Sequence, residues 1–190
     1  MPEDPSSADP EIAISGMELA AQLLTAPSAF AQVTPQEAQR VVAFMLPAFY
    51  ARGTCFIEEG DEADTGFMAL VLQGDVIVEN VTVSRDKPVT TAVLGPGCLV
   101  GEMGLLDSGP RSASCTASTD VYCAVLTRDA LYTLIAKEPA LGAKLMLGIA
   151  IRVTERLRDT ARKLKVYASL CQSMDLEMNS QLMQIERLLD

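Results

Sequence analysis

The feature that most constrains the fold is a series of short apolar segments between residues 48 and 127, separated by glycine, aspartate and proline. The segments are Cys55–Ile57, Phe67–Leu72, Val76–Val83, Val89–Leu94, Ala113–Ala117 and Val121–Leu126. Short segments at regular spacing with turn residues between them are typical of antiparallel sandwiches and rolls. No alternation of strands and helices occurs in this region, which argues against a parallel α/β sheet. We therefore predict a mainly β fold with helices (α+β), an antiparallel β-roll or jelly roll flanked by helices.

Helical patterns flank this region on both sides. Apolar residues with helical spacing predict a short helix over Gly16–Thr25. Thr34 can cap a second helix in which Pro35 takes the first position and Glu37 completes a capping box. After the β region, Asp129–Ala136 is predicted to form a short helix.

A long helix is predicted after Pro139, because no proline follows that residue and no glycine follows Gly148. Apolar residues with steps of three and four are typical of a coiled-coil seam. The seam residues are Leu157, Leu164, Cys171, Met178 and Ile185, with Val153, Tyr167, Met174 and Leu188 at companion positions. Packing on the chain's own β-roll is the alternative, but the pattern continues past what one small roll can cover. We therefore predict a parallel homodimer through this helix.

These patterns divide the chain into three parts. Residues 1–15, acidic and rich in proline and serine, are predicted to be a disordered tail. Residues 16–165 are predicted to form the folded domain, including the start of the long helix, and residues 166–190 a coiled-coil extension. The tail lacks the features of a secretion signal, and no apolar run reaches the roughly 18 residues that span a bilayer. We expect a cytoplasmic protein.

Composition excludes several kinds of site. The chain has no histidine, which removes Ser-His-Asp and Cys-His catalysis and every His-ligated metal site. Its five cysteines contain no CxxC pair, so we interpret them as small apolar core residues. A formal net charge of −10 argues against binding to nucleic acid or to anionic membranes. We expect no metal, no cofactor and no enzymatic activity.

One window, residues 101–113, combines charged groups and glycines, and we name it the cassette: GEMGLLDSGPRSA. Gly101 permits close approach of the backbone to a ligand. Met103–Asp107 can form one or two helical turns, whose first amides attract an anion. Glu102 can accept a hydrogen bond from a hydroxyl, and Arg111 can bond and neutralise a phosphate. Together these groups suit a ligand that carries a sugar hydroxyl and a phosphate.

The cassette resembles the phosphate-binding cassette of cyclic-nucleotide-binding domains, which occur in the bacterial catabolite activator protein, protein kinase A regulatory subunits and cyclic-nucleotide-gated channels. The family pattern appears here as Val100–Leu105 and Pro110–Ala113, with only the leading aromatic residue replaced, by Val100. The family's glycine turns are matched by Glu59-Gly60-Asp61, Gly74-Asp75-Val76 and Gly95-Pro96-Gly97. The resemblance covers roughly residues 30–165.

The resemblance implies a β-roll, a short helix inside the cassette and a C-terminal helix that covers the base. It implies Glu102 on the ribose 2′-hydroxyl and Arg111 on the cyclic phosphate. In the activator-protein subgroup, Ser112 matches a phosphate-contacting serine, and ungapped counting gives Arg152 the place of a ligand-proximal arginine. The other cassette residues implied at the ligand are Gly101, Met103, Gly104 and Ala113.

The long helix departs from that subgroup at the base. The subgroup reads the adenine amino group with hydroxyl residues, whereas the ungapped positions here are Arg156 and Leu157. Arginine only donates hydrogen bonds, so Arg156 can meet a guanine edge or stack on either base. It can equally be a solvated charge or one that flanks the dimer. The predicted ligand is cyclic AMP or cyclic GMP, and the base stays open.

The expected function follows from this resemblance. The activator protein has a helix-turn-helix after its long helix, but only residues 166–190 remain here, without a basic cluster. We predict a stand-alone sensor that signals ligand occupancy to an unknown effector protein and binds neither nucleic acid nor membrane. Two alternatives stay open: a scaffold module that lost the ligand, and a sensor of a cyclic dinucleotide. An enzyme on a related roll, such as a cupin, is excluded because those sites bind metal through histidines.

Overall fold

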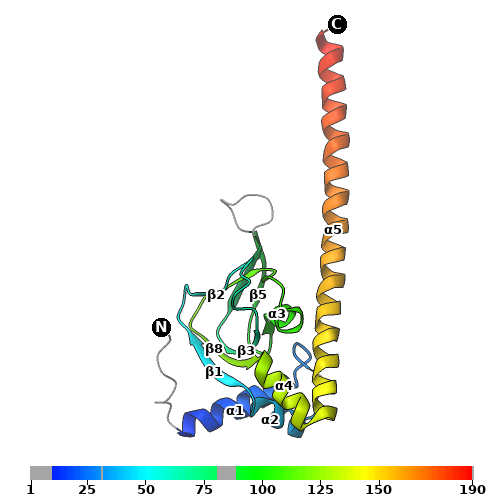
Figure 1. Ribbon diagram of the computed structural model, residues 1–190. Helices are drawn as coiled ribbons and strands as arrows, with labels where there is room; N and C mark the ends of the chain where they lie inside the picture. The colour runs from blue at the N-terminus through cyan, green and yellow to red at the C-terminus, as the bar shows by residue number, and fades with distance from the viewer. Residues whose placement is uncertain (1–9, 31, 81–88, 190) are drawn as a thin grey trace. The chain divides into compact units, whose positions relative to one another are not determined.

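The computed structural model describes residues 10–30, 32–80 and 89–189 (Figure 1). The chain divides into two compact units, Met1–Ala150 and Ile151–Asp190. The first unit holds every described strand, four helices and the start of a fifth helix, and the second holds the rest of that fifth helix. The candidate site lies within the first unit.

The described residues form eight strands in two four-stranded antiparallel sheets, which confirms the predicted β-roll. The strands are β1 (Leu46–Tyr50), β2 (Cys55–Ile57), β3 (Phe67–Gln73), β4 (Val76–Asn80), β5 (Val89–Leu94), β6 (Leu99–Val100), β7 (Ser114–Ala117) and β8 (Val121–Thr127). One sheet has the order β1-β8-β3-β6, and the other has the order β2-β7-β4-β5. Their inner faces bury a core of mostly small apolar side chains, namely Ile57, Ala69, Val71, Val76, Val100, Cys115, Ala117, Val121 and Cys123.

Two of these strands were not predicted from the sequence. β1 contains Pro47, which cannot donate to a ladder, but β1 is the edge strand beside β8 and needs donors on one side only. β6 has two residues, too few for an alternating pattern. The six strands that were predicted agree in position with β2, β3, β4, β5, β7 and β8.

The helices are α1 (Pro10–Leu24), α2 (Pro35–Val42), α3 (Glu102–Asp107), α4 (Arg128–Lys137) and α5 (Pro139–Leu189). The tail predicted over residues 1–15 is wrong for residues 10–15, which belong to α1, while residues 1–9 lie outside the described residues. Pro10 suits a first helical position because it lacks an N–H that would need an acceptor.

The predicted capping box of α2 is confirmed. The amide of Glu37 donates to Thr34 Oγ1 at 3.3 Å, and the amide of Thr34 donates to Glu37 Oε2 at 2.8 Å. Within the first unit, α1, α2 and α4 lie at one end of the sheets (Figure 1). Two charge pairs tie α2 to neighbouring helices: Lys144 Nζ near the start of α5 lies 2.7 Å from Glu37 Oε1, and Arg40 Nη1 lies 2.7 Å from Oε2 of Glu138, the C-cap of α4.

The cysteines correct one prediction. Cys115 and Cys123 are buried as expected, and burial is the main cause that raises the pKa of Cys123 to about 12. Cys55 and Cys171 are exposed, so they are not core residues. All five are free thiols.

Among the described helices, none carries an apolar stretch of the length and low charge that crossing a bilayer requires.

The ion pair between Glu37 and Lys144 gives the stability a pH dependence. Hydrogen bonding from Lys144, then from the Thr34 amide, lowers the pKa of Glu37 from 4.5 to about 2. A lowered pKa in the folded state stabilises the fold above pH 4.5 and loses that stabilisation as the pH falls toward 2. We expect Lys144→Gln to be less stable than wild type at neutral pH and to lose less stability over that interval, as measured by urea unfolding at a series of pH values. Arg162→Gln, which removes the same charge from an exposed pair with Asp159, is the control and should keep the wild-type slope.

Candidate functional site

The cassette is built around α3, which lies between β6 and β7. Its two ends are marked by left-handed backbone: Gly101 has φ 78° at the N-cap and Ser108 has φ 59° at the C-cap. This geometry confines the helix to six residues. Two charged side chains of the cassette are almost completely buried, with Glu102 1% and Arg111 4% exposed. Charged residues are rarely buried to this extent without a specific reason.

The guanidinium of Arg111 binds main-chain carbonyls from two segments. Nε and Nη2 donate to the carbonyl of Asp64 at 3.1 and 2.7 Å, and Nη1 donates to the carbonyls of Phe67 at 3.1 Å and Gly101 at 3.0 Å. The last bond joins Arg111 to the peptide that precedes Glu102. The structure therefore places the guanidinium of Arg111 beside the main chain at the start of α3, where Glu102 is the first helical residue.

An aromatic ring and two carboxylates surround the guanidinium of Arg111. The guanidinium carbon lies 4.4 Å from the centroid of the Phe67 ring, a cation–π arrangement. Burial lowers the pKa of Arg111, while the carboxylates of Asp64 and Asp61 act in the opposite direction. An arginine stays protonated at any physiological pH, so the cassette holds a permanent buried cation.

Two glycines of the cassette have no room for a side chain. A Cβ on Gly101 would lie 2.8 Å from Arg111 Nη1 and 3.0 Å from the carbonyl oxygen of Phe67. A Cβ on Gly104 would lie 2.8 Å from the carbonyl oxygen of Thr65 and 2.9 Å from Arg111 Nη1. α3 therefore packs with bare backbone against the segment 64–67 and against the arginine.

The remaining predicted cassette residues lie around this centre. Ser112 is exposed, and its hydroxyl donates to Met103 Sδ at 3.6 Å, so these two side chains meet on the outer face of the cassette. Met103 is itself 39% exposed. Ala113 is half-buried directly before β7.

The predicted residues of the long helix belong to the second unit. Arg152 forms an ion pair of 2.8 Å with Glu155 one turn further along α5. Arg156 follows on the same helix. The structure does not relate the two units to one another, so the approach of Arg152 and Arg156 to the cassette stays a prediction.

Two further parts of the site, the segment 64–67 and Arg128, support the cassette and were not predicted from the sequence. Arg111 uses the carbonyls of Asp64 and Phe67, and no sequence signal can reveal them because every residue carries a carbonyl. Arg128 donates from Nη2 and Nε to the carbonyls of Gly104 and Leu105. A signal for Arg128 did exist, since a cation in the first turn of a helix opposes the helix dipole.

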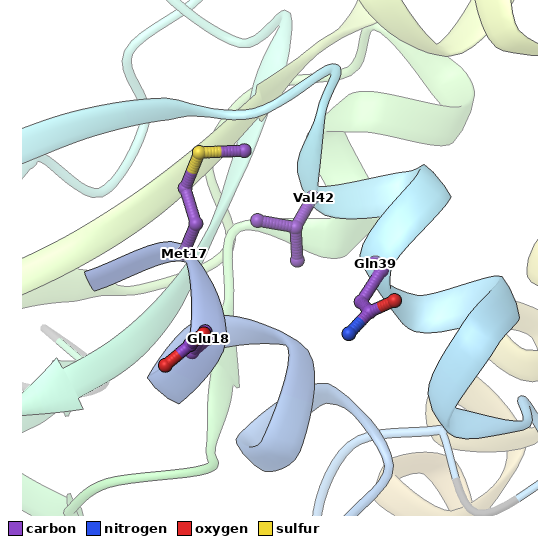
Figure 2. A pocket seen from close by; sticks show the side chains of 4 residues that line it. All are labelled: Met17, Glu18, Gln39 and Val42. Atoms are coloured by element: carbon purple, nitrogen blue, oxygen red, sulfur yellow. The ribbon is translucent and has the colours of Figure 1, made fainter. Parts of the chain in front are cut away.

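A separate hollow of about 230 Å³ lies between α1 and α2 (Figure 2). Met17 and Glu18 line it from α1, and Gln39 and Val42 line it from α2, with the Met17 thioether extending toward Val42. It has no buried charged group and belongs to the helical end of the unit. Among the described residues, no cluster of three or more metal-ligating side chains occurs.

Comparison with known proteins gives consistent matches to one family. The family model of the cyclic nucleotide-binding domain matches residues 47–138. The crystal structure of a cyclic nucleotide-binding domain from Methylobacillus flagellatus is 32% identical, with a TM-score of 0.69, and the alignment covers 80% of this chain and 83% of that one.

Two regulators are also similar in sequence. The CRP-like cAMP-activated global transcriptional regulator of Mycobacterium tuberculosis is 30% identical over 67% of this chain and 52% of its own length. The cyclic AMP receptor protein of Thermus thermophilus is 32% identical over 66% of this chain and 57% of its own length. The chain thus spans only about half the length of these regulators.

The close packing of α3 predicts an unusual effect of alanine. Gly104→Ala adds a good helix former but places its Cβ against Thr65 and Arg111, so we expect the free energy of unfolding to fall by about 1–3 kcal/mol in urea titration. Gly16→Ala in α1 is the matched control, because nothing lies within 4 Å of its Cβ, and it should raise stability by up to about 1 kcal/mol. Equal stability of Gly104→Ala and wild type would contradict the packing described above.

Proposed function

Because the chain belongs to the cyclic nucleotide-binding domain family, we propose that it is a sensor of a cyclic mononucleotide, cyclic AMP or cyclic GMP, that signals occupancy to a partner protein. The observation that carries the proposal is a pair of buried charges. Glu102 is the first residue of α3, and Arg111 follows the turn after that helix. Burying an anion and a cation costs free energy, so both charges are expected to serve either the fold or a ligand. Binding of a ligand with a hydroxyl and a phosphate gives both charges a purpose.

Arg111 is proposed to bind the cyclic phosphate. A guanidinium has five N–H donors, and the carbonyls of Asp64, Phe67 and Gly101 accept four of them. The second N–H of Nη2 has no acceptor within the described part of the chain, and we assign it to a phosphate oxygen. Because the other four bonds fix the plane of the guanidinium, this donor is oriented before the ligand arrives.

Glu102 is proposed to accept a hydrogen bond from the ribose 2′-hydroxyl, since an ionised carboxylate is a strong acceptor. Ser112 is proposed to add a hydroxyl at the phosphate, near Met103. The backbone of Gly101, Gly104 and Ala113 is proposed to line the site beside the nucleotide. Arg152 and Arg156 are proposed to reach the ligand from α5, and Arg156 would favour guanine if it donates to the base edge.

α5 is proposed to join two copies of the chain. Large apolar side chains of its seam are exposed in the second unit, with Leu157 69%, Leu164 68%, Tyr167 60%, Met174 68% and Met178 58% exposed. Their spacing of three and four residues matches a second helix of the same sequence, running parallel and in register. We propose that such a dimer carries the signal to the effector protein. We propose further that the dimer acts in the cytoplasm and binds neither nucleic acid nor membrane.

Calorimetric titration tests the ligand. We expect binding of cyclic AMP or cyclic GMP by the wild-type chain, and a loss of about 1.5–3 kcal/mol, ten- to hundredfold in Kd, for Arg111→Ala and Glu102→Ala. Arg52→Ala on an exposed turn removes the same charge as Arg111→Ala and should bind like wild type. Heat with cyclic di-GMP alone would favour a dinucleotide sensor, and no heat with any of the three would favour the scaffold module.

Cross-linking tests the dimer. In a parallel coiled coil, each seam residue of one helix faces the same residue of the other helix. The exposed thiol of Cys171 should therefore lie beside the Cys171 thiol of the second copy. We expect a short bismaleimide to convert the wild-type chain and Cys55→Ser into covalent dimers on a denaturing gel, and to leave Cys171→Ser monomeric. A covalent dimer of Cys171→Ser, or a monomeric wild-type chain in light scattering, would contradict the parallel dimer.

A further inference from the structure

The side chain of Arg128 lies at the C-terminal end of the cassette helix. Arg128 is the first residue of α4 and is half-buried. Its Nη2 donates to the carbonyl of Gly104 at 2.5 Å, and its Nε donates to the carbonyl of Leu105 at 3.2 Å. The two acceptors are consecutive, so the planar fork of the guanidinium spans two peptides of α3.

The N-terminus of α4 does not depend on the side chain of Arg128. Its N-terminus is already capped, because the amide of Ala130 donates to Thr127 Oγ1 at 3.2 Å. A cation in the first turn opposes the dipole of α4, whereas the same cation favours the C-terminal end of α3. The stabilising effect of Arg128 therefore falls on the cassette and not on its own helix.

α3 needs such support from outside. It has six residues, and helices this short are marginal on their own. The amide of Leu105 donates to Gly101 at 3.3 Å and the amide of Ser108 donates to Gly104 at 3.2 Å, both long bonds. Arg111 holds the first end of α3 through the Gly101 carbonyl, and Arg128 holds the other end.

Both arginines also hold the same neighbouring segment. The amide of Arg128 donates to the carbonyl of Gly66 at 2.7 Å, between the two residues, Asp64 and Phe67, whose carbonyls Arg111 binds. α3 and the segment 64–67 are thus fixed to one another by two arginines, of which only Arg111 belongs to the cassette.

We infer that Arg128 is a positioning residue for nucleotide binding: by holding the carbonyls of Gly104 and Leu105 it keeps α3, and with it Glu102, in the orientation that receives the ligand. The inference rests on the proposed function, since it assigns Arg128 a part in that same site. Arg128 acts through the main chain of α3 and need not touch the nucleotide.

Two substitutions separate this role from a general effect of charge. Arg128→Gln removes the charge and the fork, and we expect it to weaken binding of cyclic AMP, or of cyclic GMP if wild type prefers it, by at least about tenfold, the scale of one charge-assisted hydrogen bond. Arg128→Lys keeps the charge but can bind only one of the two carbonyls at a time. Its affinity for the nucleotide should lie between those of wild type and Arg128→Gln. Arg40→Gln, whose side chain pairs with Glu138 away from the cassette, is the matched control and should bind like wild type.

Hydrogen exchange of the ligand-free chain supplies a second readout that does not depend on binding. We expect the amides of residues 102–107 to exchange faster in Arg128→Gln, with β3 and β8 unchanged and thermal unfolding still cooperative. Unchanged hydrogen exchange in α3 of Arg128→Gln would overturn the inference. Nucleotide affinities of Arg128→Gln and Arg128→Lys that both lie within twofold of wild type would also overturn it. So would a wild-type affinity of Arg128→Lys together with weak binding by Arg128→Gln. A wild-type chain that binds no nucleotide would overturn the proposed function, while the exchange result would still decide whether Arg128 holds α3.

Discussion

The buried guanidinium of Arg111 is the interaction on which the candidate site depends. One side chain fixes the carbonyls of Asp64 before β3, of Phe67 at the start of β3 and of Gly101 before α3. Only a planar group with several donors in fixed directions can join segments from different parts of the roll in this way. The cation is therefore held by main-chain dipoles before a ligand is present, and an anion that binds it meets a site that needs little rearrangement.

Much of this arrangement was predictable because local chemistry specified it. The capping box at Thr34 and Glu37, six of the strands and the presence of a helix within residues 103–107 follow from turn residues, apolar periodicity and capping residues. β1 and β6 did not, because an edge strand with a proline and a two-residue strand carry no alternating pattern. The burial of Glu102 and Arg111 could be expected only from the resemblance to a family, since composition alone makes such charges surface residues.

The support of the cassette shows why a site is harder to predict than a fold. The acceptors that orient Arg111 and Arg128 are carbonyls, which have no signature in a sequence, and they lie 10 to 47 positions from their donors. The exposed seam of α5 shows the opposite case, because a repeat of apolar residues predicts a contact surface even where the described chain leaves that surface uncovered. The predicted ligand site and the predicted coiled-coil seam thus rest on different kinds of sequence signal in the two units.

The use of carbonyls as acceptors has a consequence for how this sequence can diverge. Every residue type offers the same carbonyl, so a substitution of Asp64 removes no acceptor from Arg111, although it removes a carboxylate that favours the charged guanidinium. Gly101 and Gly104 have no such freedom, because their neighbours occupy the volume of a side chain. A carbonyl contact can therefore persist at a position whose side chain changes, as long as the backbone keeps its course.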